Sequence, residues 1–551
     1  MVYNNGAGLT GVATDNLLRF VPGKSLSFDA AGGQTGRLTI NGAAYKLIFT
    51  RAQLEAINSE LTVQAGASAN YFLDPGDKVI GGNYALGTNL DLAGKTYNGA
   101  VLSPGATANN PPPIAGVFEG LGHTIANMNI TVPRELPNNG GLAPNSYGVG
   151  FIGFLTGTVR DIGIVSGSIG LAPGTNNSTY DSQLVGGLVG FATADSVITT
   201  SYSAVSVTGG QSIGGLVGDT VGRVSYSYAT GAVSGLAYLG GLVGSQGEGN
   251  FRPSSPTSSI TNSYATGTVS SLSSTGRDVN GNLATFWGAT SGGLAGEWYV
   301  GTISNSYATG DVLKSAGTSG GLVGRTGNVT YSSVYASGRV DKSNLVSTSY
   351  MGGLIGSVYA STGTNTFTNG AYFNAQANPG LSAVGSFQTN TTYGAWTPAN
   401  SNGAATGRTS ADMTAGNIFA GFSSSAWSAT AGSTPKLTAW MSEAPRLDAD
   451  GLARHLHRYG LGRLLDHSAD HLTQPLATPD SAAQGGRQAW SEGLAAMRHR
   501  AALEQERSPV GELPADDAGH LNRWFYRLDR LLNRDGGDGA EPDDEPSGTV
   551  R

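Results

Sequence analysis

The chain contains no cysteine and few charged residues. Without cysteine, a disulfide framework, a zinc–cysteine site, an iron–sulfur cluster and a cysteine nucleophile are all excluded. Charged residues make up only 13% of the 551 residues, and the formal net charge is −7. Because general nucleic-acid binding needs a dense basic surface, we expect no nucleic-acid partner. We also expect no cofactor.

Long hydrophobic runs are absent as well. No stretch approaches the ~18 apolar residues of a membrane-spanning helix, so we expect no transmembrane segment. The first residues, MVYNNGAGLTGVATDN, lack the basic start and the apolar core of a signal peptide. Large exported bacterial surface proteins nevertheless often lack cysteine, because they cross the periplasm unfolded. We therefore predict a secreted or outer-membrane-associated cell-surface protein, with an export region upstream of Met1.

Glycine is the residue in excess, with 85 copies, about 15% of the chain against a usual share of about 7%. Hydrophobic residues still make up 39%, which is enough to bury a core. Glycine this dense, with apolar residues between, is typical of many short strands joined by tight turns.

A block of the form Gly-Gly-Leu-Val-Gly recurs six times, and a degenerate seventh copy spans 148–153. The first glycine of the block recurs after 28, 26, 52, 28 and 32 residues. We interpret the 52-residue interval as one unit enlarged by insertions near 245–259 and 270–290. The first glycine and the leucine of each block are Gly186 and Leu188, Gly214 and Leu216, Gly240 and Leu242, Gly292 and Leu294, Gly320 and Leu322, and Gly352 and Leu354.

A second block, of the form Ser-Tyr-Ala-Thr-Gly-x-Val, follows the first in five of these units. Its tyrosines are Tyr202, Tyr228, Tyr264, Tyr307 and Tyr335. The residues four before each tyrosine are Ile198, Val224, Ile260, Ile303 and Tyr331. The valines five after it are Val207, Val233, Val269, Val312 and Val340.

The two blocks together predict a β-solenoid. Each unit of about 26–28 residues contains three short strand-like pieces, none long enough to be stable alone. Stacked as coils, the units would place the leucines in one internal ladder and the valines in another, with every strand paired to the coils above and below. Paired helices are disfavoured because Gly-Gly and β-branched residues would fill them. The predicted fold is therefore an all-β parallel β-helix.

The paired blocks resemble the GLUG repeat of bacterial surface exoproteins. The segments YALGTNLDL at 84–92 and FEGLGHTIANM at 118–128 resemble the lead-in of such proteins, and 409–437 resembles the segment that ends a GLUG array. The whole is most similar to filamentous-hemagglutinin-like adhesins exported by two-partner secretion, although the NPN motifs of their secretion domain are absent. The resemblance implies a right-handed β-helix, an outer-membrane transporter as export partner, and a host glycan or receptor as ligand.

Composition divides the chain near residue 447. Residues 447–551 contain 12 arginines, no lysine, 18 acidic residues and six of the seven histidines. Apolar residues there recur at helical spacing, which predicts a short α-helical C-terminal tail. The predicted segments are N-terminal strands at 1–50, lead-in coils with a short helix at 51–140, the GLUG β-helix at 141–375, a closing segment at 376–446, the helical tail at 447–534 and a disordered acidic end at 535–551.

Within the first two segments the pattern is more detailed. Alternating apolar residues predict strands over 24–48, 84–92 and 117–130. A capped helix is predicted at 50–57 and a loop at 94–115.

The charged residues offer little for catalysis. A glycan-cleaving site on a β-helix needs carboxylates on neighbouring coils of one face. We expect no such pair among the acidic residues of the array, and hence no enzyme and no metal site. These residues are Asp161, Asp181, Asp195, Asp219, Glu248, Asp278, Glu297, Asp311 and Asp341.

Two further features have alternative interpretations. His123 lacks a second histidine nearby and is expected to be structural, whereas His467 and His471 in the tail are expected on a solvated helical face rather than at a metal. The repeated tyrosines either stack in the core or along a turn, or form an outer aromatic stripe that binds glycans.

Three functions remain open. The first is an adhesin or structural filament that attaches to host cells, surfaces or other bacteria, with unknown ligand-binding residues. The second is a polysaccharide-acting enzyme on the same fold. The third is a non-catalytic stalk of a secreted peptidase or toxin system.

Overall fold

The structure is a computed structural model of the chain. It describes residues 2–3 and 25–438, except 29–37, 41, 64–76, 105–111, 133–147, 172–183, 248–257, 273–274, 278–282, 286–288, 314–316, 342–349, 359–364, 388–400 and 403–404. The chain divides into two units, Met1–Ala444 and Pro445–Arg551. Because the described residues end at 438, the predicted helical tail, its histidines and the acidic end lie outside them. In the described part, no helix has the length and apolarity needed to cross a membrane.

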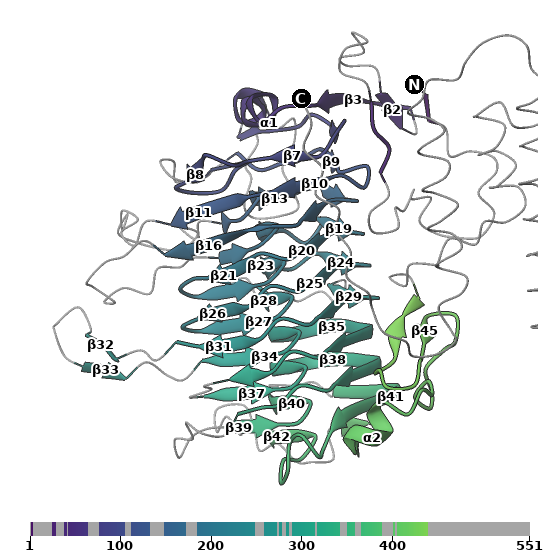
Figure 1. Cartoon of the computed structure of the whole chain (residues 1–551). Coiled ribbons are helices and arrows are strands. Elements are labelled where there is room, and N and C mark those ends of the chain that lie inside the picture. Colours follow the sequence, from purple (N-terminus) through teal and green to yellow (C-terminus); the bar gives the residue numbers. More distant parts are fainter. Residues whose placement is uncertain are drawn as a thin grey trace, which may run out of the picture. The chain divides into compact units, whose positions relative to one another are not determined.

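The predicted parallel β-helix is confirmed. Successive units lie on top of one another as coils, and Figure 1 shows their strands stacked in sequence order from purple to green. The described strand pairs between coils are parallel, as in β20 (Tyr202–Ser203) with β25 (Tyr228–Ala229) and β22 (Ser212–Gly214) with β27 (Tyr238–Gly240). Antiparallel pairs occur, among the described strands, only in local hairpins.

The coils between residues 148 and 271 hold five short strands each rather than the three expected, whereas the coil 290–313 holds three, one of them the 14-residue β35 (Ala295–Ala308). In the coil 184–211 the five strands are β17 to β21, because the Gly-Gly-Leu-Val-Gly block and the segment around the tyrosine each form two strands separated by a bend. The first two strands fold back on each other around Gly187 and Leu188. The expectation of three strands was wrong for the five-stranded coils, because sequence pattern does not reveal a bend that interrupts a strand-like run.

The strands of equivalent position form continuous columns along the rod. The first column is β12 (Gly148–Val149), β17 (Leu184–Gly186), β22 (Ser212–Gly214), β27 (Tyr238–Gly240), β34 (Thr290–Gly292), β37 (Thr318–Gly320) and β39 (Tyr350–Gly352). The second is β13 (Ile152–Leu155), β18 (Val189–Ala192), β23 (Val217–Thr220), β28 (Val243–Ser245), the start of β35 (Ala295–Ala308) and of β38 (Val323–Ala336), β40 (Ile355–Val358) and β42 (Val384–Phe387).

The remaining three columns complete each coil. The third is β6 (Tyr84–Leu86), β9 (Val117–Glu119), β14 (Thr158–Arg160), β19 (Val197–Thr199), β24 (Arg223–Ser225), β29 (Ser259–Thr261), the middle of β35 and β38, and β41 (Asn365–Asn374). The fourth is β7 (Leu90–Asp91), β10 (Thr124–Ala126), β15 (Gly163–Ile164), β20 (Tyr202–Ser203), β25 (Tyr228–Ala229), β30 (Tyr264–Ala265), the ends of β35, β38 and β41, and β44 (Thr406–Arg408). The fifth is β8 (Thr96–Tyr97), β11 (Met128–Val132), β16 (Gly167–Leu171), β21 (Ser206–Thr208), β26 (Val233–Gly235), β31 (Val269–Ser271) and β36 (Val312–Leu313).

The repeated apolar residues lie inside the coils. The six repeat leucines are fully buried, and the backbone N–H of Leu188 donates to the carbonyl of Leu216, as each does to the next. Val207, Val233, Val269, Val312 and Val340 pair in register on the fifth column. Each buried leucine contributes about 1.5–3 kcal/mol by leaving water, so the interior ladders stabilise the rod along its length.

The 52-residue unit is a single coil with insertions, as its spacing indicated. It runs from β27 through β28 to β31, and an added hairpin of β32 (Thr275–Arg277) and β33 (Leu283–Thr285) follows before β34. Figure 1 shows this hairpin projecting from the side of the stack. Most of the other insertion, at 248–257, lies outside the described residues.

The Gly-Gly pairs are required because the first and second columns meet backbone to backbone. The first glycines pair in register, Gly214 with Gly240 and so on along the rod. A Cβ on Gly240 would overlap the carbonyl of Val243 in the facing strand, and one on Gly241 would overlap the carbonyl of Gly293 in the next coil. Glycine is therefore needed here by the closeness of two walls, not by an unusual φ angle.

A sharp bend separates the third and fourth columns in every coil. The bend residue takes a left-handed conformation without being glycine, with φ of 50° at Asn262 and 44° at Asn305. The serine after it, such as Ser263, donates to the carbonyl two residues earlier, and its oxygen accepts from the N–H of Ser227 in the preceding coil. Four coils carry this serine directly before the repeat tyrosine, at Ser201, Ser227, Ser263 and Ser306.

The N-terminal segments close the first coils. Here β1 (Val2–Tyr3) pairs with β2 (Leu38–Ile40), which forms a hairpin with β3 (Ala43–Ile48). Leu26 and Phe28, expected in a strand, instead donate single backbone hydrogen bonds to Leu121 and Gly87. The loop expected at 94–115 contains strand β8, which pairs with β11; its two residues were too few to give a pattern.

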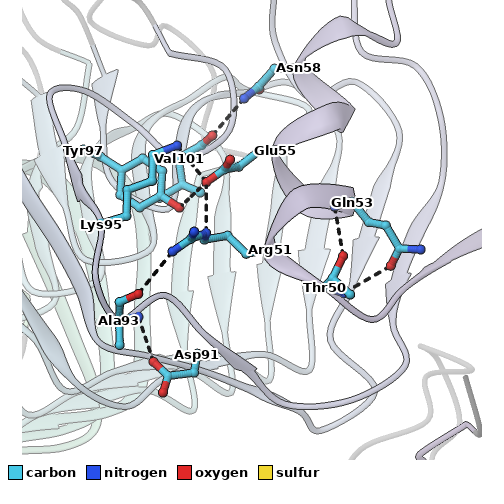
Figure 2. Close-up of polar contacts among 10 residues, drawn as sticks. All are labelled: Thr50, Arg51, Gln53, Glu55, Asn58, Asp91, Ala93, Lys95, Tyr97 and Val101. Carbon is cyan, nitrogen blue, oxygen red and sulfur yellow. Dashed lines mark hydrogen bonds and ion pairs between the residues drawn. The ribbon is translucent and has the colours of Figure 1, made fainter.

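The helix expected at 50–57 is α1 (Arg51–Ala56), which covers the end of the stack (Figure 1) and continues as a turn at Ile57–Ser59. Thr50 and Gln53 form a reciprocal capping box, and Leu54 and Ile57 are fully buried. Figure 2 shows its polar side facing the segment around Lys95 and Tyr97: the Glu55 carboxylate accepts from Lys95 and from the Tyr97 hydroxyl at 2.8 Å each. A hairpin of β4 (Thr62–Val63) and β5 (Lys78–Val79) follows.

Close contact of the two walls predicts a large cost for any side chain at the paired glycines. We expect Gly240→Ala to lower the free energy of unfolding by about 2–3 kcal/mol, because the facing strand must move. Gly170→Ala is the matched control, since its Cβ would meet no atom within 4 Å. Urea unfolding followed by circular dichroism measures both; equal effects would contradict the wall contact.

Candidate binding surface: the tyrosine column

The five repeat tyrosines form one stacked column on the outside of the rod. They pair in register on the fourth column of strands, and their ring centroids are 4.7–4.9 Å apart with planes within 3–4° of parallel. The residue after each tyrosine, such as Ala229 or Ala265, points inward and is fully buried. The structure thus combines the two interpretations of the sequence: the tyrosines stack along a turn, and they do so on the outer face.

Exposure decreases along this column. Tyr202, Tyr228 and Tyr264 are half-buried, whereas Tyr307 and Tyr335 are 5% and 0% exposed. Burial raises the pKa of all five hydroxyls above its ordinary value. These phenols therefore stay neutral in ordinary buffers, and the column carries no charge.

The closing segment covers the buried end of the column. Residues 405–438 contain α2 (Ser410–Met413) and a hairpin of β45 (Trp427–Ser428) and β46 (Lys436–Leu437), and Figure 1 shows them beside β38 and β41. Their apolar side chains form one cluster with the tyrosines. Its members are Tyr307, Tyr335, Tyr372, Met413, Phe419, Phe422, Trp427 and Leu437.

The closing segment packs its aromatic rings against the last two rings of the column. The Phe419 ring is perpendicular to Tyr335, at 86° and 5.5 Å, and the Trp427 ring lies 5.9 and 5.8 Å from Tyr307 and Tyr335. Hydrogen bonds fix its position: Trp427 Nε1 donates to Asn305 Oδ1 at 3.2 Å, and the Tyr335 hydroxyl donates to the carbonyl of Pro435 at 2.6 Å. The sequence linked 409–437 with the end of the array, but not with the tyrosines.

The half-buried part of the column is the candidate binding surface. It consists of Tyr202, Tyr228 and Tyr264, flanked on the third column by the half-buried hydroxyl side chains of Ser225 and Thr261. Ring faces are hidden there, because each ring lies against the next and Tyr202 lies over Gly163, whose missing side chain makes room for it. The surface therefore offers ring edges and hydroxyl groups to a ligand.

The acidic residues are arranged differently from the expectation. Asp219, Ser245, Glu297 and Arg325 pair in register on the second column, so two carboxylates expected to be scattered share one column. The Ser245 hydroxyl donates to the Asp219 carboxylate. The Glu297 carboxylate accepts from the Tyr299 hydroxyl and forms an ion pair with Arg325 at 3.0 Å. The expectation failed because the insertions hide that these positions are equivalent.

A second acidic group lies in the lead-in coils. Glu119 forms an ion pair with Arg160, and Asp161 adjoins them, beneath the hairpin that carries Tyr45. Burial raises the pKa of Glu119, although Arg160 opposes the shift. Glu119 and Asp161 are each 3% exposed, Glu297 is 3% exposed and Asp219 is fully buried. Carboxylates this enclosed hold coils together and do not face a polymeric substrate.

The other acidic residues and His123 take local positions. Asp195 is exposed, Asp311 and Asp341 flank Arg339, and Asp181, Glu248 and Asp278 lie outside the described residues. His123 is 1% exposed, and its ring nitrogens lie 3.0 Å from Asn89 Oδ1 and from the carbonyl of Leu26. In the part of the chain that the structure describes, no three His, Asp or Glu side chains group as metal ligands would.

Comparison with known proteins identifies the repeat. Residues 235–270 match the family model of the GLUG motif, which confirms the resemblance seen in the two blocks. A search of the curated proteins found no match. Among solved structures, a candidate immunoglobulin A1 protease from Bacteroides ovatus is similar, with 17% identity, a TM-score of 0.36, and coverage of 72% of this chain and 93% of that one.

The covered half of the column gives a prediction for the closing segment. Trp427 is 1% exposed, so we expect Trp427→Ala to weaken the attachment of 405–438 by about 3–5 kcal/mol. Hydrogen exchange measured by mass spectrometry should then show faster exchange in 405–438 and unchanged exchange in 184–247. Trp427→Phe, which keeps a ring, should have a smaller effect; uniform loosening of the whole rod would contradict the assignment.

Burial of His123 gives a prediction for pH dependence. Burial lowers its pKa in the folded state, so the unfolded chain binds the proton more readily. Its stabilising contribution is complete above the unfolded pKa of about 6.5 and is lost as the pH falls through that value. We expect His123→Gln to show a smaller loss of stability than the unmodified chain between about pH 7.5 and 5.5. Equal losses in urea unfolding would refute this.

Proposed function

We propose that this chain is a secreted or cell-surface adhesin or filament protein, which acts by binding and not by catalysis. The observation that carries the proposal is the GLUG-containing rod, whose outer face presents a regular, uncharged column of tyrosine and hydroxyl side chains. Such a rod repeats one surface along its length, which suits attachment to host cells, to surfaces or to other bacteria. The half-buried part of the tyrosine column is its proposed binding surface.

The export route belongs to the same proposal. Two-partner secretion through an outer-membrane transporter is compatible with a chain that lacks cysteine and whose coils can form one after another. A host glycan or receptor is the proposed partner. A role as the non-catalytic stalk of a secreted peptidase or toxin system would use the same rod; a transporter gene found beside this one would favour the adhesin.

Location and attachment test the proposal together. Expressed with the reading frame upstream of Met1, the chain should be degraded by protease added to intact cells. Deletion of the gene should reduce attachment to host cells or surfaces, and the purified chain should restore it. A chain found only in the cytosol, with attachment unchanged by deletion, would overturn the proposal.

A polysaccharide-acting enzyme is the alternative, and the buried carboxylates distinguish the two. Under the binding proposal, Glu297→Gln leaves Arg325 without its charge partner and lowers the free energy of unfolding by about 3 kcal/mol. Attachment by the folded protein should stay unchanged, and no reducing sugar should appear from polysaccharide with either protein.

The matched control is Asp195→Asn, which changes an exposed acid and should alter stability by less than about 0.5 kcal/mol. The enzyme would be favoured if the unmodified chain released sugar and the Glu297→Gln variant did not, with the variant as stable as the unmodified chain.

A further inference from the structure

The outer face of the third column carries two rows of hydroxyl side chains in four successive coils. Strand alternation turns Ile260, Ile303 and Tyr331 inward, where they are fully buried, so the residues on either side of each face outward. Figure 1 shows the strands that carry the rows, β29, β35, β38 and β41, one above another. Paired in register, one row is Ser259, Thr302, Thr330 and Thr366, and the other is Thr261, Ser304, Ser332 and Thr368.

Most of these hydroxyl groups have no hydrogen-bond partner in the part of the chain that the structure describes. The two exceptions lie at one end of the second row, where Ser332 accepts from Asn369 Nδ2 at 3.0 Å and Thr368 donates to the carbonyl of Tyr331 at 3.4 Å. All eight side chains are half-buried or exposed. The other six hydroxyls can therefore both donate and accept hydrogen bonds at the surface.

Outward hydroxyls elsewhere on the rod are engaged with one another. In the preceding coils of the third column, the Ser225 hydroxyl donates to Thr199 Oγ1 at 2.9 Å. On the fifth column, the hydroxyls of Thr208 and Ser234 are also 2.9 Å apart. The two rows thus differ from similar faces of the same rod by hydrogen-bonding capacity that the protein itself does not use.

The two rows form a regular and uncharged lattice. Neighbouring positions in a row are about 4.8 Å apart and the rows about 6.7 Å apart, because strands pair at the first spacing and every second residue of a strand faces the same way. Serine and threonine are mixed in both rows, so the repeated group is the hydroxyl and not the threonine methyl. Arg223 precedes Ser259 in its row and bounds the lattice. Such a surface suits an uncharged ligand that repeats hydroxyl groups along its own length.

We propose that these two rows bind an extended, uncharged polysaccharide of the cellulose or chitin type, laid along the rod. Each sugar ring of such a chain advances by nearly the spacing of one coil, so successive rings present their hydroxyls to successive pairs of the lattice. The proposal rests on the proposed binding function and gives it a second surface with a stated class of ligand. It requires no contact with the tyrosine column.

Depletion of the full-length chain from solution by insoluble cellulose and by insoluble chitin tests the proposal. At least one of the two should bind the chain saturably. The double variant Thr302→Val and Thr330→Val should bind roughly tenfold more weakly, because two hydroxyls are lost from the middle of one row. Valine has the shape of threonine and already occupies equivalent positions in earlier coils, at Val117 and Val197, so the variant should fold.

The matched control is Thr131→Val, which removes an exposed hydroxyl from the fifth column and should bind within about twofold of the unmodified chain. Circular dichroism establishes that each variant is folded. The proposal is overturned if neither polysaccharide binds, if the double variant binds as tightly as the unmodified chain, or if Thr131→Val weakens binding equally. Binding of the anionic polygalacturonate in place of the neutral chains would also overturn it. Failure here with attachment to cells intact would remove this ligand and leave the proposed function standing.

Discussion

In-register pairing of parallel strands between successive coils is the interaction on which the rest of this structure depends. Each strand pairs with its equivalents above and below at a spacing of about 4.8 Å, so each type of position becomes a column of like residues. Inside, columns of leucine and valine form a continuous core. Where two walls meet backbone to backbone, the column accepts only glycine, as Gly214 and Gly240 illustrate. The large glycine content therefore follows from repeating one narrow coil.

The same register produces the outer surface. A tyrosine that faces outward in one coil lies against its equivalent in the next, and the uniform spacing stacks the rings face to face. Stacking hides the ring faces and leaves edges and hydroxyl groups as the chemistry available outside. The closing segment packs against Tyr307 and Tyr335 and covers them, whereas Tyr202, Tyr228 and Tyr264 stay half-buried. Structure and binding thus share one set of residues.

Much of the fold could be predicted from sequence, because a repeat translates directly into stacked coils. Gly186 and its equivalents, the leucines and the tyrosines all occupy equivalent positions, which the periodic spacing made visible. Features that depend on contacts between distant or interrupted segments could not be predicted. Asp219 and Glu297 occupy one column, but an enlarged coil between them hides this. Trp427 reaches Asn305 across 122 residues of sequence, which no local pattern encodes. The bends lie inside the repeated blocks, where the residue pattern does not distinguish a bend from a continuous strand.

The most direct test of the in-register stack uses the absence of cysteine. Ser225 and Thr261 are paired on adjacent coils and face outward, so the double variant Ser225→Cys and Thr261→Cys should form a disulfide under mild oxidation. The pair Ser225→Cys and Ser304→Cys spans two coils, about 9.6 Å, and should not. Mass spectrometry of proteolytic fragments measures both. Efficient cross-linking of the first pair alone is the predicted result; equal cross-linking of the two pairs, or of neither, would contradict the stacked register.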